Sequence, residues 1–141
     1  MKKRTILCID DSGNLLQVLK MRFEMEVPNV KVITAMDGEA GLELARSAAP
    51  DLILLDVVMP GLTGDVVLKQ LKSAETGRGE GYDTRGIPVI VYTARGLGKR
   101  EKFLALGAAE FIESPFDTTN LVSIVRNILP SQPLPLDEET S

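Results

Sequence analysis

Short apolar runs alternate along the chain with stretches in which apolar residues recur every three or four positions. The runs have the length of β-strands and lie at residues 5–9, 30–35, 52–55, 87–92 and 109–112. Several are almost continuous in Val, Ile and Leu, which is typical of strands covered on both faces. The pattern therefore predicts a buried, parallel sheet.

The stretches between the runs have helical periodicity. In the first, Leu15, Leu19 and Phe23 lie four residues apart. The last carries a similar apolar stripe, formed by Leu121, Ile124, Val125, Ile128 and Leu129. Such stripes are expected of helices that pack one face against a sheet.

Polar residues and glycines give the expected limits of the other helices. Asp37 can cap a second helix that ends near Ala48. The remaining boundary residues are Thr63 or Gly64 at the start of a third helix, Gly98 and Gly107 near the ends of a fourth, and Asp117 as the cap of a fifth. Strand and helix thus alternate, which predicts an α/β fold with helices on both faces of the sheet. Five strands favour the flavodoxin-like, doubly wound (βα)5 order 2-1-3-4-5, with a ligand crevice at the carboxyl ends of the strands.

Two segments do not fit this repeat. Residues 74–86 are rich in glycine and mixed charges, and we expect a surface insertion there, with a partner-binding loop as the alternative. Residues 130–141 contain three prolines and three acids, so we expect an extended or disordered tail. Residues 1–129 would form a single domain.

Composition narrows the possible functions. The chain has 141 residues, a net charge of −4, one cysteine and no histidine. The absence of histidine excludes Ser–His and Cys–His catalysis, histidine zinc sites and a phosphohistidine donor. The acidity disfavours direct nucleic-acid binding. The basic start at residues 2–4 precedes an apolar run too short for a signal peptide or a membrane span, so we expect a cytoplasmic protein with no membrane contact.

Candidate chemistry lies where the predicted strands end. Asp10 and Asp11 follow the first strand, Asp56 the third and Thr93 the fourth. Carboxylates that converge at an apolar sheet edge repel one another unless a cation joins them. Ligands that offer only oxygen suit Mg²⁺. The alternative for each aspartate is a structural one, because an Asp after a strand often caps a helix or forms a turn.

Four segments together resemble the receiver domain of bacterial two-component response regulators, over roughly residues 4–129. They are residues 9–11, 54–61, 91–94 and 111–116, each at the end of an expected strand. The resemblance implies that Asp56 accepts a phosphoryl group from a phosphohistidine on a histidine kinase or phosphotransfer protein. The Mg²⁺ ligands that it implies are Asp10, Asp11, Asp56 and the backbone carbonyl of Val58.

The resemblance also implies a switch. Thr93 would donate its hydroxyl to a phosphoryl oxygen, and Phe111 would change rotamer when Thr93 moves. On the residues alone, Thr93 could equally be a strand-end cap and Phe111 a core residue. The output would be a protein partner bound at the face made by the fourth helix, the fifth strand and the fifth helix.

One position departs from the family pattern. Receivers have a lysine before the proline that follows the fifth strand, whereas this chain has Ser114 there. Losing that charge should weaken phosphoryl transfer by about 1–3 kcal/mol. Arg95 could supply a compensating charge, or could simply be solvated. In the family the peptide before this proline is typically cis, so we expect a cis bond before Pro115.

Three hypotheses follow. The first is a stand-alone receiver, a signalling domain whose only catalysis is its own phosphotransfer and dephosphorylation. The second is a pseudo-receiver that binds partners independently of phosphorylation because of Ser114. The third is a small phosphatase or an FMN-binding flavodoxin. The phosphatase is disfavoured because Val58 stands where such enzymes use a second acid, and the flavodoxin because the acidic loop at residues 10–14 would repel a flavin phosphate.

Overall fold

Five parallel strands form one sheet in the order β2-β1-β3-β4-β5. The computed structural model describes residues 3–73, 83–93, 98–113 and 118–130. The strands are β1 (Arg4–Ile9), β2 (Val30–Ala35), β3 (Leu52–Asp56), β4 (Val89–Thr93) and β5 (Glu110–Glu113). The helices are α1 (Gly13–Glu26), α2 (Gly38–Ala48), α3 (Gly64–Lys72), α4 (Arg100–Ala105) and α5 (Thr118–Ile128). The predicted α/β flavodoxin-like topology is confirmed.

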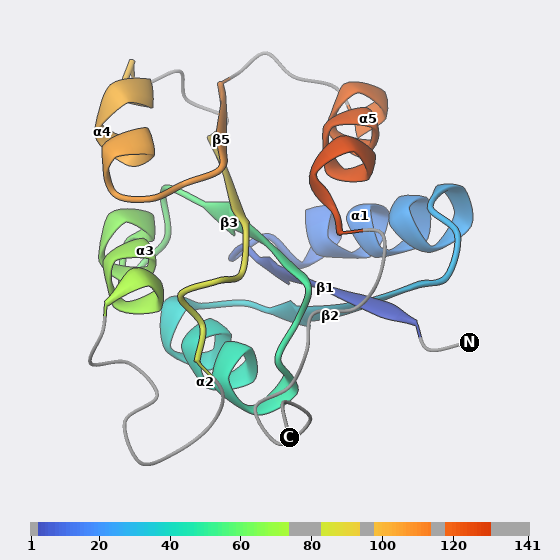
Figure 1. The fold of residues 1–141 in the computed structure, drawn as a ribbon, viewed down its shortest axis with the longest axis horizontal. Coiled ribbons are helices and arrows are strands. Elements are labelled where there is room, and N and C mark those ends of the chain that lie inside the picture. Colours follow the sequence, from blue (N-terminus) through green and yellow to red (C-terminus); the bar gives the residue numbers. More distant parts are fainter. Residues whose placement is uncertain (1–2, 74–82, 94–97, 114–117, 131–141) are drawn as a thin grey trace.

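Helices cover both faces of the sheet (Figure 1). On one face, α1 and α5 pack on strand residues such as Cys8, Leu54 and Tyr92. On the other, α2, α3 and α4 pack on the alternate residues, such as Leu55 and Phe111. This alternation explains why the strands are almost continuously apolar: both faces of each strand are buried. None of the described helices has the length and hydropathy needed to span a membrane.

Most predicted boundaries hold to within a few residues. Asp37 caps α2 by accepting a hydrogen bond from the Ala40 amide at 2.8 Å. The fourth helix, predicted to start near Gly98 and to be closed by Gly107, covers Arg100–Ala105, because Gly98 and Gly107 have positive φ angles of 64° and 109° that do not fit an α-helix. The fourth strand begins at Val89 and not at residue 87, because Pro88 has no N–H to continue the ladder.

Part of the predicted insertion belongs to the folded body. Thr84 is fully buried, and its hydroxyl donates to the carbonyl of Leu71 at 2.8 Å. Lys72 donates to the carbonyls of Arg85 and Ile87, at 3.0 and 2.6 Å. The segment that enters β4 is therefore fastened to the end of α3. Residues 74–82, the predicted tail beyond residue 130 and the predicted cap Asp117 lie outside the described residues.

Two side chains of α1 close the free edge of β2. Among the described strands, β2 pairs only with β1, so alternate backbone groups of β2 point away from the sheet. Glu24 accepts a hydrogen bond from the Val32 amide at 2.9 Å, and Lys20 donates to the Val32 carbonyl at 3.1 Å. The two side chains also pair with each other at 2.8 Å. This arrangement satisfies the amide and carbonyl of Val32, which would otherwise be open to another strand.

Substitution of Glu24 by alanine should lower the free energy of unfolding by about 0.5–1.5 kcal/mol, because it removes an ion pair and an acceptor for a backbone amide. The Lys20 ammonium and the Val32 amide lower the pKa of Glu24. The decrease in the free energy of unfolding should therefore be largest at pH 7 and become smaller as the pH falls through that pKa. Urea unfolding at several pH values measures it. Glu43→Ala, on the exposed face of α2, is the matched control, and equal losses in the two variants would contradict the edge contact.

Candidate functional site

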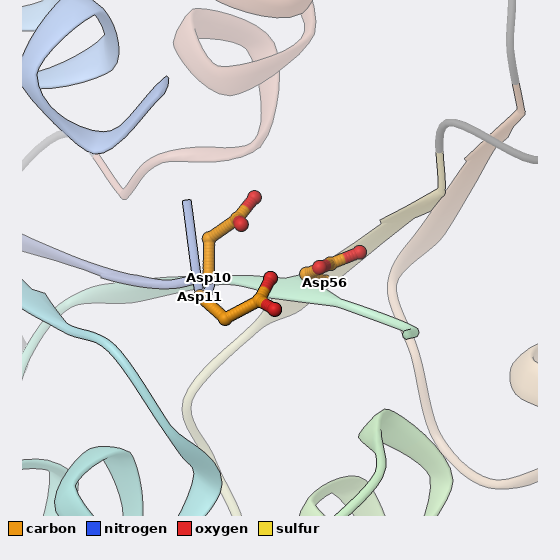
Figure 2. A group of neighbouring side chains, drawn as sticks. All are labelled: Asp10, Asp11 and Asp56. Carbon is orange, nitrogen blue, oxygen red and sulfur yellow. The ribbon is translucent and has the colours of Figure 1, made fainter. Parts of the chain in front are cut away.

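Three aspartates gather where β1 and β3 end (Figure 2). Asp10 and Asp11 follow β1, and Asp56 is the last residue of β3, the strand next to β1 in the sheet. One carboxylate oxygen of each lies within 4.8 Å of one from each of the others. The structure therefore brings the predicted acidic residues together at the predicted edge.

Local backbone contacts fix the positions of two of these acids. Ser12 caps α1 through its hydroxyl, which accepts from the Leu15 amide at 3.2 Å, and its own amide donates to Asp10 Oδ1 at 2.8 Å. The Val58 amide donates to Asp56 Oδ1 at 3.3 Å. The first turn of α3 lies so close to the end of β3 that a Cβ on Gly64 would stand 2.7 Å from the Asp56 carbonyl oxygen. Only glycine fits there.

Burial and like charge oppose ionisation of the cluster. Asp10 and Asp56 are only 3% and 8% exposed. Burial, followed by the neighbouring charge of Asp10, raises the pKa of Asp56 from 3.8 to about 7. Burial also raises the pKa of Asp10, although hydrogen bonds from Tyr92 and Ser12 counter part of that effect. The metal-free site is thus electrostatically strained.

A cavity of about 590 Å³ opens over these carboxylates. Its lining residues are Asp10, Asp11, Ser12, Leu15, Asp56, Val58, Met59, Pro60, Tyr92 and Thr93. None of these described lining residues is a lysine or an arginine, so positive charge would have to come from elsewhere. Clustered carboxylate oxygens without nitrogen or sulfur ligands fit a hard divalent cation such as Mg²⁺.

Tyr92 belongs to the site although the sequence analysis did not select it. Its hydroxyl donates a hydrogen bond to Asp10 Oδ2, and the residue is 2% exposed. Burial and the Asp10 charge raise the pKa of Tyr92, so the phenol keeps its proton and remains a donor. A signal was present in the sequence: Tyr92 precedes Thr93 at the end of a predicted strand, and the order 2-1-3-4-5 places that strand beside β3.

The two predicted switch residues lie on neighbouring strands. Thr93 is fully buried and ends β4, where it lines the cavity. Phe111 is 2% exposed in β5 and stacks on Phe103 of α4, with ring centroids 5.3 Å apart. Arg100 of α4 also donates to the Phe111 carbonyl at 2.8 Å. Phe111 is therefore joined to α4 through both its ring and its backbone.

Three predicted positions fall outside the described residues. They are Arg95, Ser114 and Pro115, which the sequence analysis assigned to a compensating charge, the altered lysine position and a cis peptide.

Substitution of Asp56 by asparagine should stabilise the Mg²⁺-free protein. The pKa of Asp56 in the fold lies above the ordinary 3.8, so its contribution to stability is complete below about pH 4 and is lost as the pH rises to about 7. The advantage of the Asp56→Asn variant over the wild type should grow over that interval to about 1–3 kcal/mol, measured by thermal unfolding in the presence of a chelator.

The matched control is Asp83→Asn. Arg85 lowers the pKa of Asp83 to about 2, so this substitution should not stabilise the protein at neutral pH. Added Mg²⁺ should raise the melting temperature of the wild type more than that of the Asp56→Asn variant. A gain in the Asp56→Asn variant that does not depend on pH would show that ionisation of Asp56 is not its source.

Comparisons of this chain with known proteins all indicate the same family. Residues 6–126 match the family described as the response regulator receiver domain. Response regulator PleD of Caulobacter vibrioides (strain NA1000 / CB15N) is 39% identical over 124 residues, or 87% of this chain and 25% of that protein. Transcriptional regulatory protein CpxR of Escherichia coli K12 is 41% identical over 125 residues, or 88% of this chain and 48% of that protein. The chain thus spans a quarter to a half of the length of these curated relatives.

Solved structures agree with the sequence relatives. The receiver domain of the Francisella response regulator 1452 superposes with a TM-score of 0.73 at 28% identity, covering 90% of this chain and 96% of that one. The chemotaxis response regulator CheY4 of Vibrio cholerae gives 0.75 at 25% identity, covering 91% of this chain and all of the other. With its five-stranded sheet, its acidic cluster and these matches, the chain belongs to the family of response regulator receiver domains.

Proposed function

We propose that this receiver accepts a phosphoryl group on Asp56, with Mg²⁺ bound by Asp10, Asp11, Asp56 and the backbone carbonyl of Val58. Receiver domains are signalling domains that typically bind Mg²⁺ at an acidic pocket. The observation that carries the proposal is the carboxylate cluster, whose oxygens lie within 4.8 Å of one another beneath an open cavity.

In the proposed step, a carboxylate oxygen of Asp56 attacks the phosphorus of a phosphohistidine on a histidine kinase or phosphotransfer protein. The new P–O bond forms as the P–N bond breaks, and the departing imidazole nitrogen keeps the bonding electron pair and takes up a proton. When bound, Mg²⁺ would neutralise charge on the transferring phosphoryl oxygens. The raised pKa of Asp56 gives a second reason for a cation: without one, much of Asp56 is protonated near pH 7 and cannot act as the nucleophile.

The signal would leave the site through Thr93 and Phe111. The Thr93 hydroxyl would donate to a phosphoryl oxygen, and Phe111 would move with it as the population shifts toward the phosphorylated conformation. Because Phe111 stacks on Phe103, a displacement of Phe111 would change the packing of α4 on the sheet. The proposed output is a downstream protein that binds the face made by α4, β5 and α5.

The second candidate is a pseudo-receiver, favoured by Ser114 at the position of the family lysine. A hydroxyl there can donate one hydrogen bond but carries no charge to pair with the phosphoryl group. The same fold could then bind its partner without phosphorylation.

Intact-mass measurement after incubation with Mg²⁺ and a small phosphodonor separates the two functions. The wild type should gain about 80 Da, the mass of one phosphoryl group, and Asp56→Asn should gain nothing. Ser114→Lys should accelerate formation of the adduct by about 5- to 150-fold, because it restores a charge beside the phosphoryl group.

An adduct that appears only in the Ser114→Lys variant would favour the pseudo-receiver. If Mg²⁺ binds but neither protein gains mass, phosphoryl transfer to Asp56 is contradicted. An adduct that persists in Asp56→Asn would assign the phosphorylation to a different residue.

A further inference from the structure

We propose that Tyr92 is a positioning residue of the acidic site: its hydroxyl holds Asp10 in the orientation that a divalent cation needs. This inference rests on the proposed Mg²⁺ site and adds to it a neutral residue outside the implied ligand set. No ligand role is assigned to Tyr92 itself.

The register of the sheet places Tyr92 level with the acids. Ile9 pairs with Leu55 and Asp56 pairs with Tyr92, so Asp10, Asp56 and Tyr92 lie in one row across β1, β3 and β4. Side chains alternate along strands, and the buried residues two positions before each of the three all face α1 and α5. The row therefore projects its three side chains toward the same face.

Only a long donor on β4 can reach Asp10. Strand β3 lies between β1 and β4, so β1 and β4 are separated by about 10 Å, or two strand spacings. The side chains of Tyr92 and Asp10 together cross that interval, and the Tyr92 hydroxyl donates to Asp10 Oδ2. A phenylalanine would fill nearly the same volume without the donor.

Two donors together restrain the Asp10 carboxylate. The Ser12 amide donates to Oδ1, and the Tyr92 hydroxyl donates to Oδ2. Without Tyr92, Asp10 could rotate about its side-chain bonds, away from the neighbouring charges of Asp11 and Asp56. The hydrogen bond thus opposes the motion that repulsion would otherwise cause.

The loss of Mg²⁺ binding relative to the loss of Ca²⁺ binding distinguishes a positioning role of Tyr92 from a purely electrostatic one. Mg²⁺ requires near-ideal octahedral geometry, whereas Ca²⁺ accepts six to eight oxygen ligands in flexible arrangements. A displaced Asp10 should therefore weaken Mg²⁺ binding more than Ca²⁺ binding. If the Tyr92 hydroxyl acted only through its electrostatic effect, its removal would weaken Mg²⁺ binding and Ca²⁺ binding equally.

The experiment is calorimetric titration of the wild type and Tyr92→Phe with Mg²⁺ and, separately, with Ca²⁺. We expect the Kd for Mg²⁺ to rise about 3- to 10-fold in the variant, the effect of one lost hydrogen bond, and the Kd for Ca²⁺ to rise less than about 2-fold. Thermal unfolding of the metal-free proteins shows that the variant is folded.

Ile90→Val is the matched control, because Ile90 is a fully buried residue of β4 on the same face as Tyr92. It should lower the melting temperature and leave both Kd values unchanged. Equal Kd values for the wild type and Tyr92→Phe, or equal losses for both cations, would overturn the positioning role. Absence of Mg²⁺ binding in the wild type would instead overturn the proposed metal site on which this inference rests.

Discussion

Electrostatic repulsion between Asp10, Asp11 and Asp56 is the constraint on which the polar edge of this sheet depends. Asp10 and Asp56 are buried, so their charges lose hydration and are poorly screened, and burial together with the neighbouring acids raises the pKa of both. Backbone amides of Ser12 and Val58 donate to the cluster and offset only part of that cost. A positive charge that enters the site therefore lowers its free energy, and a hard cation such as Mg²⁺ would supply that charge.

A site under such repulsion needs a rigid support. Buried apolar clusters on both faces of the sheet supply it, because strands packed on two sides cannot shift to relieve a clash at their ends. The first turn of α3 packs directly against the backbone at the end of β3, because Gly64 has no side chain to separate them. At the free edge of β2, Lys20 and Glu24 bond to the backbone carbonyl and amide of Val32.

The sequence predicted the strand order and the acidic cluster because both follow from simple rules. Apolar runs of strand length mark a doubly buried sheet, and polar residues directly after them must meet at one edge. Helix limits were less exact where backbone conformation decides them, as the positive φ of Gly98 shows. Tyr92 was not selected because its position before Thr93 shows where it lies on the strand but not that its hydroxyl reaches Asp10. Its role depends on register across three strands, which a single strand pattern does not contain.

The end of β4 joins the two halves of the proposed mechanism. Tyr92 and Thr93 are adjacent, so they project to opposite faces of the sheet. Tyr92 faces α1 and α5 and contacts Asp10, while Thr93 lies on the side of Phe111 and α4. A hydrogen bond from Thr93 to a phosphoryl oxygen would pull on the backbone at the end of β4. The same stretch of backbone carries Tyr92, which donates to Asp10. Cation binding and the movement of Phe111 should therefore be energetically linked through this strand end, and by reciprocity the state of α4 should alter the affinity for the cation.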